Sequence, residues 1–503
     1  MKNSQPNILF IQFDQLATHA LQIYGNPVVK TPHIDSLAEQ SVVFENAYCN
    51  FPLCAPSRFS MLSGQLCSRI GAYDNAAEFP ASVPTFIHYL RAMGYQTSLV
   101  GKMHYVGPDQ LHGFEERLTT DIYPADYIWT GDWSIDKPPY AADMRALTDA
   151  GVCTRSVQMD FDDVVCHRTQ QKLYDLARSS DNRPFFLTVS MTHPHDPYLC
   201  TQEYWDCYKH DDIELPEVGR PEDSEQDAHS LRLLHQCGLT EFEATDEQIR
   251  NARHGYYGAV SYVDDKVGEI LKVLDANGLR DNTVIILTSD HGEFLGERGL
   301  WFKRSFFEPA SRVPLIVSAP DQFSRRRVKQ NVSLMDLFPT LLEFGSAKRA
   351  PEMVQEIDGE SLCGLMDGND DNWSDTVYGE ILSEGVLTPL FMIRKGVYKY
   401  VYSKADPSQL FDIKSDPNEL NNLSGQDKFE QMENEFMQQV TSKWDSDALS
   451  EEIVQSQQTR LFLQKVLSRG KHTAWDYADT DEVTVHCYRG EGSYNDWAYT
   501  AIN

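Results

Sequence analysis

The sequence predicts an α/β fold in which helices sandwich a large, mixed but mostly parallel sheet, with a smaller α+β domain and an extended tail after it. Apolar runs of strand length recur, and Asn7–Phe13 and Thr283–Ser289 are apolar enough to be buried on both faces of a sheet. Segments of helical periodicity lie between such runs, as in residues 83–93. The chain has 503 residues, which is more than one small core accommodates.

Strands and helices alternate in the predicted large domain. We expect strands at residues 7–13, 42–44, 95–100, 184–191, 283–289 and 313–319, and helices at residues 33–40, 83–93, 161–178, 256–274 and 333–345. Residues 106–150 are aromatic and loop-like, which is typical of a pocket wall. Residues 202–253 are highly charged and poor in strand signal, which favours an insertion or lid.

A change of pattern near residue 371 divides the chain. Shorter strands at residues 376–382, 390–393 and 398–402, then helices at residues 429–444 and 452–467, indicate an antiparallel α+β unit. We therefore predict a large domain at residues 1–371, a C-terminal subdomain at residues 372–469 and a tail at residues 470–503. The tail is aromatic, and the need to cover such a surface favours a subunit interface.

Charge and cysteine content disfavour several classes of protein. The chain has 44 Lys and Arg against 75 Asp and Glu, a net charge of −31 that repels a nucleic-acid backbone. The basic run Arg325, Arg326 and Arg327 is typical of a solvated turn. Ten cysteines without regular spacing indicate reduced thiols. A leader-like start and an apolar run of about 20 residues are both lacking, so we expect a cytoplasmic protein with no membrane or nucleic-acid partner.

Ionisable residues follow the predicted strands directly. Because open α/β sheets bind ligands at the carboxyl ends of their strands, these residues should meet at one edge: Asp14, Lys102, His104, His195, Asp290 and His291. Asp14, Asp290 and His291, with the carbonyl oxygen of Gln15, make a mostly oxygen site for a hard divalent cation. The nitrogen of His291 also suits Mn²⁺ or Mg²⁺.

Residues 54–58 read Cys-Ala-Pro-Ser-Arg, and Ser57 with Ser63 and Gly64 predicts a tight turn into a helix start. A buried Cys54 thiol would be inert, whereas a thiolate could attack an acyl group as in a cysteine hydrolase. The spacing of Cys54, Pro56 and Arg58 fits C-x-P-x-R. With this motif, the chain up to about Leu423 resembles the type I sulfatases of the alkaline phosphatase superfamily, in which a maturation system oxidises the cysteine to formylglycine.

The resemblance implies an alkaline phosphatase-like fold for a sulfatase catalytic domain, a calcium ion at the predicted cation site, and the modified Cys54 as one of its ligands. The hydrated aldehyde attacks the sulfur of a sulfate monoester and expels the alcohol. The resulting covalent hemiacetal sulfate then collapses when a base takes the proton of the second hydroxyl. Positive charge placed beforehand at the sulfuryl oxygens stabilises such a transition state.

The same resemblance assigns a role to each catalytic candidate. Arg58 would hold the diol, and Lys102 would contact both the nucleophile and the sulfate. His104 would be the base for the collapse. His195 and Lys303 would lie on the sulfate and leaving-group side, where a poor alkoxide leaving group needs a proton donor.

Longer stretches resemble the choline sulfatase branch of the family, namely residues 107–117, 119–126, 486–490 and 493–497. The Asp14-Gln15 and Asp290-His291 pairs are similar to that branch and to phosphonate monoester hydrolases. A quaternary ammonium is recognised by aromatic faces and carboxylates, so Trp129, Glu384 and Asp496 are candidates, with Asn75 nearer the ester. The family also implies a homo-oligomer, a dimer or tetramer, whose tail reaches a neighbouring subunit.

The chain departs from choline sulfatases at Ala141, Ala142 and Asp143, where those enzymes tend to have a His-Asn pair before a methionine. This difference leaves other alkyl or aryl sulfates open as substrates, and Asp143 becomes a further candidate for the ammonium. Two other functions also stay open, a phosphonate or phosphate ester hydrolase and a non-catalytic choline- or sulfate-binding protein. Binding alone does not require the full set of candidate catalytic side chains.

Overall fold

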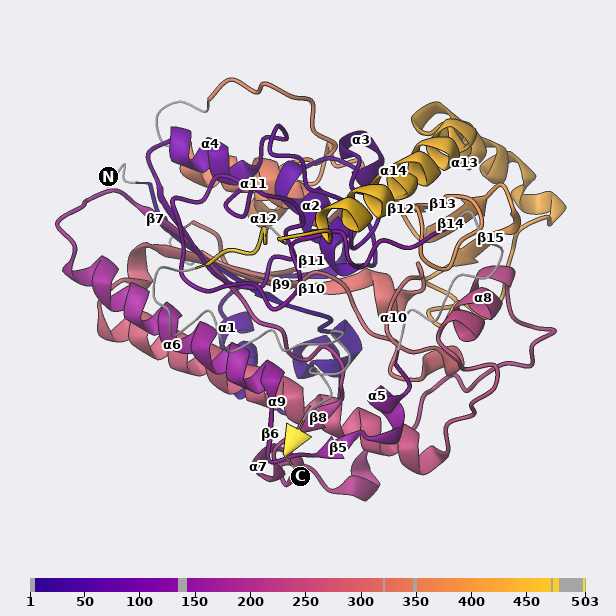
Figure 1. Ribbon diagram of the computed structural model, residues 1–503, viewed down its shortest axis with the longest axis horizontal. Coiled ribbons are helices and arrows are strands. Elements are labelled where there is room, and N and C mark those ends of the chain that lie inside the picture. Colours follow the sequence, from indigo (N-terminus) through magenta and orange to yellow (C-terminus); the bar gives the residue numbers. More distant parts are fainter. Residues whose placement is uncertain are drawn as a thin grey trace.

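The computed structural model describes residues 5–133, 143–319, 322–346, 351–471, 474–478 and 501–502. Its centre is an eight-stranded sheet, seen edge-on between two groups of helices in Figure 1. In spatial order its strands are β11 (Arg326–Ser333), β2 (Val42–Tyr48), β10 (Arg312–Ser318), β9 (Thr283–Ser289), β1 (Asn7–Phe13), β7 (Phe185–Ser190), β3 (Gln96–Gly101) and β4 (Glu116–Arg117). The strands β9, β1, β7, β3 and β4 pair in parallel, whereas β10 is antiparallel to both of its neighbours, so the sheet is mixed and mostly parallel as predicted.

Helices cover both faces because successive side chains of a buried strand point to opposite sides. Ile8 and Phe10 of β1 belong to the hydrophobic cluster on one side, and Leu9 and Ile11 to the cluster on the other. The first side carries α2 (Cys54–Ser63), α3 (Cys67–Ile70), α4 (Phe86–Ala92), α11 (Leu337–Gly345) and α12 (Cys363–Asp367). The second carries α1 (Pro32–Ala38), α6 (Val157–Arg178) and α9 (Asp246–Ala276).

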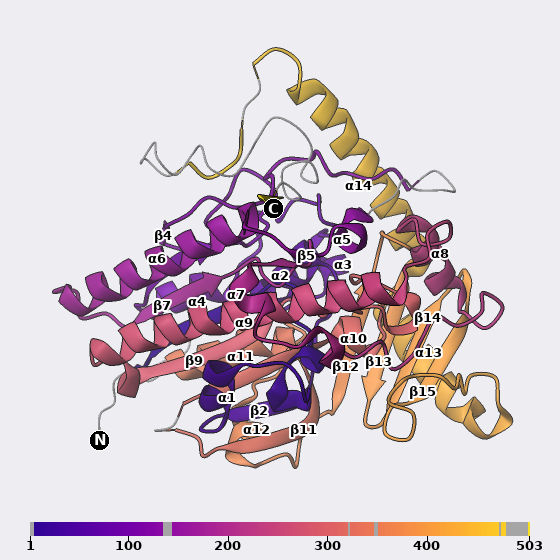
Figure 2. The same ribbon diagram turned by 90° about the horizontal axis from the view of Figure 1, so that it is seen from below.

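A second, antiparallel sheet follows the large one. It consists of β12 (Thr376–Ile381), β13 (Leu390–Lys395), β14 (Tyr398–Ser403) and β15 (Asp406–Asp412), and α13 (Glu430–Lys443) packs on it. The helix α14 (Ser446–Leu467) then runs back along the large domain, and its C-terminal end projects beyond it (Figure 2). Buried residues of both sheets, such as Phe10 and Phe391, share one hydrophobic cluster. The domain boundaries at residues 371 and 469 stay predictions.

Shorter elements complete the described chain. Two-stranded ladders join β5 (Gly151–Val152) to β8 (Leu199–Cys200) and β6 (Arg155–Ser156) to β16 (Ala501–Ile502). The remaining α-helices are α5 (Arg145–Thr148), α7 (Gln202–Trp205), α8 (Ala228–Gln236) and α10 (Glu308–Ser311). Single 3₁₀ turns lie at Thr18–Ala20, Gln22–Tyr24, His210–Asp212, Arg280–Asn282, Glu297–Gly299, Leu334–Asp336 and Asp427–Phe429. Within these described ranges, no helix is both long enough and apolar enough to span a bilayer.

Two expectations about elements were wrong, and one strand was not predicted. The helix α2 begins at Cys54 itself, and Gly64 (φ 67°) ends it, so Ser57 and Ser63 lie inside the helix and not in a turn before it. Arg326 and Arg327 are exposed as expected, but they open the edge strand β11. The strand β15 carries Asp406 and Pro407, which are depleted in strands, and only its position at the sheet edge accommodates the missing N–H of Pro407.

Candidate active site

Four strand ends bring the candidate residues together. Asp14 follows β1, Lys102 follows β3, His195 lies in the loop after β7, and Asp290 follows β9. Because β9, β1, β7 and β3 are parallel neighbours, their carboxyl ends lie at one edge of the sheet. All four side chains are buried, which makes their charges interact strongly.

The helix α2 presents Cys54 to this edge from its first turn. The Cys54 Sγ lies 3.2 Å from His291 Nε2 and 3.9 Å from Asp14 Oδ1. Burial raises the pKa of the Cys54 thiol to about 11, and the neighbouring Asp14 adds to this rise. Such a thiol is protonated near neutral pH, which makes it a poor nucleophile in its unmodified form.

Arg58, one turn further along α2, ties the strand ends to each other. Its guanidinium donates to Asp290 Oδ2 from Nε (2.9 Å), to Asp14 Oδ2 from Nη2 (3.1 Å) and to Ser190 Oγ from Nη1 (2.8 Å). Burial alone would lower the pKa of Arg58, but Asp290 and Asp14 outweigh it and raise that pKa. The guanidinium therefore stays charged and holds both carboxylates in place.

The residues around Cys54 fit a divalent cation. One ligand atom from each of Asp14, Cys54, Asp290 and His291 lies within 4.8 Å of the others, and all four residues are buried. Burial would raise the pKa of Asp14, but Lys102, His195 and Arg58 lower it well below its usual range, so this carboxylate is charged. Two carboxylates and an imidazole suit a hard or borderline cation. The predicted ligand Gln15 donates its backbone N–H to Asp290, while its carboxamide contacts Lys303, Asp196 and Glu293.

His195 and Lys303 form a hydrogen-bonded pair next to the candidate cation site. The Lys303 Nζ donates to His195 Nε2 at 2.8 Å, and the His195 Nδ1–H donates to the Asp196 carbonyl at 2.8 Å. Burial lowers the pKa of His195 to about 4, and Asp196 offsets this only in part. The imidazole is therefore neutral, and Lys303 is the charged proton donor of the pair. His193 lies apart from this pair, with Nδ1 2.6 Å from Asp162.

Neither ring nitrogen of the buried His104 has a hydrogen-bond partner among the residues that the structure describes, and among the histidines of this edge this distinguishes it from His195 and His291. Its backbone N–H donates to Asp121 Oδ2 at 2.9 Å, and its φ of 59° is uncommon for a residue with a side chain. Burial and the charge of Lys102 lower its pKa well below the usual range. A neutral, unpartnered imidazole held in a strained backbone is suited to accept a proton.

Aromatic rings line the space beside His104. The ring centroids of Tyr123 and Trp129 lie 4.7 and 5.5 Å from that of His104, and Lys102 Nζ lies 3.7 Å from the centre of Tyr123. Trp129 is half-buried, whereas Tyr123 and His104 are buried. Two aromatic residues of the predicted wall, Tyr123 and Trp129, thus lie next to the catalytic candidates.

The other substrate candidates have different settings. Asn75 Oδ1 accepts a hydrogen bond from the backbone N–H of Ala55 at 3.0 Å, next to Cys54. Glu384 forms an ion pair with Arg304, so its charge is already compensated. Asp143 pairs with Arg145. Asp496, Ala141 and Ala142 lie outside the described residues.

Three residues at this edge were not among the predicted site residues. Ser190 is the last residue of β7 and contacts Arg58. Asp196 supplies the carbonyl that fixes His195. Glu293 accepts hydrogen bonds from Leu295 N and Phe302 N, and burial raises its pKa to about 8. The position of Ser190 at a strand end and that of Glu293 just after Asp290 and His291 were signals that could have revealed them.

Comparison with known proteins agrees with this geometry. A sulfatase family model matches residues 6–346, and a model of the C-terminal part of N-sulphoglucosamine sulphohydrolase matches residues 296–445. A choline-sulfatase of Rhizobium meliloti is 41% identical over 500 residues, which cover 97% of this chain and 96% of the relative. An arylsulfatase of Clostridium perfringens is 28% identical over 461 residues, which cover 85% and 92%.

Solved structures share the fold at lower identity. A phosphonate monoester hydrolase of Agrobacterium radiobacter has a TM-score of 0.70 at 22% identity, with 87% of this chain and 95% of that one covered. A sulfatase from Bacteroides thetaiotaomicron has a TM-score of 0.68 at 22% identity, with 98% of both chains covered. The chain therefore belongs to the sulfatase family, and it is a sulfuric ester hydrolase similar to choline sulfatase.

Proposed function

We propose that this sulfatase hydrolyses choline-O-sulfate to choline and sulfate, with Cys54 converted to formylglycine and a divalent cation, Ca²⁺, beside it. The supporting observation is the aromatic wall of Tyr123 and the half-buried Trp129 next to Lys102 and His104, in a chain 41% identical to a choline-sulfatase. A quaternary ammonium has no N–H to donate, so it binds best to aromatic faces. The oxidation of Cys54 requires a formylglycine-generating maturation system.

Asp14, Asp290 and His291, with Gln15 and the modified Cys54, would hold the cation, which supplies positive charge to the nucleophile and to the sulfuryl oxygens. Arg58 keeps both carboxylates oriented through the 2.9 and 3.1 Å contacts. Lys102 lies between Asp14 and the Tyr123 ring, where its charge faces the sulfate as negative charge builds up on it.

Proton transfer is divided between two sides of the site. Lys303, paired with His195 at 2.8 Å, donates a proton to the leaving alkoxide. His104 then takes the proton of the second hydroxyl of the modified Cys54, and this allows sulfate to leave. The two residues act in different steps of the type I sulfatase route. Lys303 acts when the alcohol leaves, and His104 acts when sulfate is released.

The decisive experiment compares substrates on enzyme produced together with the maturation system. We expect the highest kcat/KM for choline-O-sulfate, a lower value for 4-nitrophenyl sulfate, and the lowest for 4-nitrophenyl phosphate and for a phosphonate monoester. A preference for the phosphate or phosphonate ester would instead favour the hydrolase alternative. Equal rates on the two sulfates would favour an arylsulfatase.

Two variants test recognition of the ammonium. Trp129→Leu should raise KM for choline-O-sulfate by about tenfold or more, since a desolvated cation–π contact contributes about 2 kcal/mol. Asp496→Ala should raise the same KM because it removes a carboxylate that would face the ammonium. KM for 4-nitrophenyl sulfate should change much less. Equal losses on both sulfates would contradict the choline assignment.

The cation is tested by chelation and reloading. Ca²⁺ added to chelated enzyme should raise its melting temperature and restore turnover, and Mn²⁺ and Mg²⁺ serve as comparisons. Asp14→Asn should lose this thermal shift. A homo-oligomer with the tail at the subunit interface, and a cytoplasmic location, remain parts of the proposal that light scattering and fractionation would test.

A further inference from the structure

One face of α14 is buried along its length, and its residues change from apolar to polar towards the C-terminal end of the helix. Its buried residues are Leu449, Ile453, Gln457 and Arg460, a spacing of four, four and three that places them on one stripe. Leu449 and Ile453 pack into the hydrophobic cluster that the two sheets share. Gln457 and Arg460 are buried just as deeply, at 1% and 4% exposure, although Gln and Arg are rarely so enclosed without partners.

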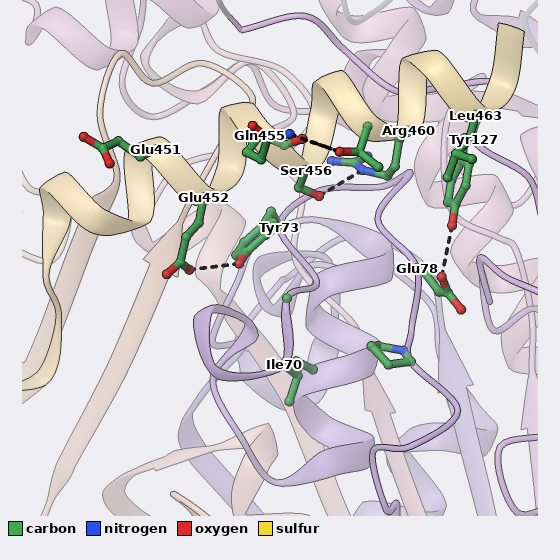
Figure 3. A pocket seen from close by; sticks show the side chains of 13 residues that line it. Ile70, Tyr73, Glu78, Tyr127, Glu451, Glu452, Gln455, Ser456, Arg460 and Leu463 are labelled. Atoms are coloured by element: carbon green, nitrogen blue, oxygen red, sulfur yellow. Dashed lines mark hydrogen bonds between the residues drawn. The ribbon is translucent and has the colours of Figure 1, made fainter.

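Arg460 meets Asp74 of the large domain in a two-pronged ion pair. Its Nη1 and Nη2 donate to Asp74 Oδ1 and Oδ2, each at 2.7 Å, and Gln457 Nε2 donates to Oδ2 at 3.4 Å. The backbone N–H of Ala76 donates to Oδ1 at 3.0 Å. Figure 3 shows Arg460 projecting from α14 towards the loop that carries Tyr73. Both Asp74 oxygens are thus occupied, and the loop has one fixed orientation relative to the helix.

The next residue in that loop, Asn75, caps the helix that begins at Cys54. The residue before α2 is Leu53, whose side chain cannot accept a hydrogen bond, and Pro56 has no N–H. Asn75 Oδ1 fills the role from outside the helix by accepting from Ala55 N at 3.0 Å. The orientation of the first turn of α2 therefore depends on the loop that Arg460 holds.

Arg460 and Gln457 also contact the loop that carries Trp129 of the aromatic wall. Arg460 Nη1 donates to Thr130 Oγ1 at 3.4 Å, and the backbone N–H of Trp133 donates to Gln457 Oε1 at 3.2 Å. Thr130 directly follows Trp129. One helix beyond the large sheet therefore contacts both loops that flank the candidate substrate space.

We propose that Arg460 and Gln457 are positioning residues for substrate binding, which set the place of Asn75 at the Cys54 helix and of Trp129 at the aromatic wall. The inference rests on the proposed function, in which Trp129 contacts the substrate, and on the prediction that Asn75 lies near the ester. A buried ion pair adds little stability compared with apolar side chains of similar size, whereas it does fix geometry. Leu449 and Ile453, at equivalent depth on the same stripe, show that this helix face accepts apolar residues where only packing is needed.

The test compares Arg460→Gln with Lys465→Gln. Both remove one positive charge from α14, but Lys465 is exposed and serves as the control. We expect Arg460→Gln to raise KM for choline-O-sulfate by about tenfold or more, because small displacements of binding groups reduce rates by up to about 10²-fold. Arg460→Lys should recover part of the loss, and Lys465→Gln should stay within about twofold of wild type on the same reasoning. Converted Cys54 is measured by peptide mass, and each rate is expressed per converted enzyme.

A melting temperature that falls in Arg460→Gln while KM and kcat stay at wild-type values would overturn the inference, since it would show a purely structural role. If Arg460→Gln does not fold, Gln457→Met tests the positioning role instead. This variant removes the contacts to Trp133 and Asp74 and keeps the side-chain length. An unchanged KM in Gln457→Met would then overturn the inference. If wild type does not turn over choline-O-sulfate, the proposed function fails separately, and a raised KM for 4-nitrophenyl sulfate in these variants would still support the role of Asn75.

Discussion

Each charged side chain around Cys54 has an ion-pair or hydrogen-bond partner. Arg58 and Lys102 face Asp14 and Asp290, and the Lys303 ammonium faces the neutral imidazole of His195. Each buried charge therefore has a partner, which is the condition under which charged groups are tolerated in a protein interior. Arg58 is fully occupied by hydrogen bonds to protein groups, so its role is to hold the carboxylates. Lys303 and His104 retain the capacity to transfer a proton.

At the residue scale, the role of Lys303 is tested by the leaving group. Lys303→Ala should lower kcat/KM for choline-O-sulfate by about 10²-fold or more, because general-acid catalysis contributes about 10² to 10⁴ and choline is a poor leaving group. The loss on 4-nitrophenyl sulfate should be much smaller. Lys404→Ala, at an exposed lysine paired with Asp447, is the matched control and should leave both values unchanged. Equal losses on the two esters would assign Lys303 to binding of the sulfate group.

The meeting of the candidate catalytic residues at one edge could be predicted from the sequence, since Asp14, Lys102, His195 and Asp290 each follow an apolar run. The partners of those residues could not be predicted in the same way. Glu384 is a clear example, because its ion pair with Arg304 joins residues 80 positions apart and depends on how the second sheet packs. The capping of α2 by Asn75 has no local sequence signal for the same reason.

At the element scale, the catalytic edge depends on the close approach of β3 and β7. Gly101 ends β3 with φ 106°, and a Cβ added there would lie 1.9 Å from the carbonyl oxygen of Ser190. That same carbonyl accepts from Lys102 N at 3.0 Å, and Ser190 Oγ contacts Arg58. Glycine at position 101 therefore allows Lys102 and Ser190 to reach the site together.

Gly101→Ala should lower the free energy of unfolding by more than about 4 kcal/mol, as expected for a severe steric change. Gly94→Ala is the matched control, because Gly94 also has a positive φ of 93°, but no described atom lies within 4 Å of its added Cβ. Its cost should be only about 1 to 2 kcal/mol, from the left-handed backbone alone. Urea denaturation measures both values, and equal costs would contradict the close-approach explanation.

Among the elements, periodicity predicted the central strands well and the edges poorly. Strands β1 and β9 match their predicted bounds because burial on both faces leaves an unbroken apolar run. The edge strands β11 and β15 carry charged residues and a proline, as edge strands often do, so they resemble loops in sequence. The start of α9 at Asp246, ten residues before the predicted one, follows from a capping box of Thr245 and Gln248.

At the scale of the whole molecule, Glu380 joins the two sheets. It lies on β12, its backbone N–H donates to Asn50 O at 2.8 Å, and its carboxylate accepts from Ser68 N at 2.7 Å and from Trp444 Nε1 at 2.9 Å. Burial raises its pKa to about 7, and the hydrogen bonds from Ser68 and Trp444 offset this only in part. The carboxyl group contacts Ser68 of α3 and Trp444, which follows α13, so its shifted pKa reports how the C-terminal sheet packs on the large domain.

This shift predicts how stability depends on pH. The folded state keeps the Glu380 proton up to about pH 7, while the unfolded state loses it near pH 4.5, so stability falls as the pH rises between these values. Relative to wild type, Glu380→Gln should gain about 2.5 kcal/mol between pH 5 and pH 8, because one pKa unit corresponds to about 1.4 kcal/mol. Denaturation of both proteins at the two pH values measures this change. A difference that is independent of pH would contradict the assignment.

The proposed reaction requires Cys54 to act as a modified residue, and peptide mass spectrometry tests this most directly. Preparations made with increasing amounts of the maturation system should contain increasing fractions of a peptide in which Cys54 has lost sulfur and gained oxygen. We predict that choline-O-sulfate turnover is proportional to that fraction and vanishes in Cys54→Ala. Full turnover by enzyme whose Cys54 is entirely unmodified would contradict the account.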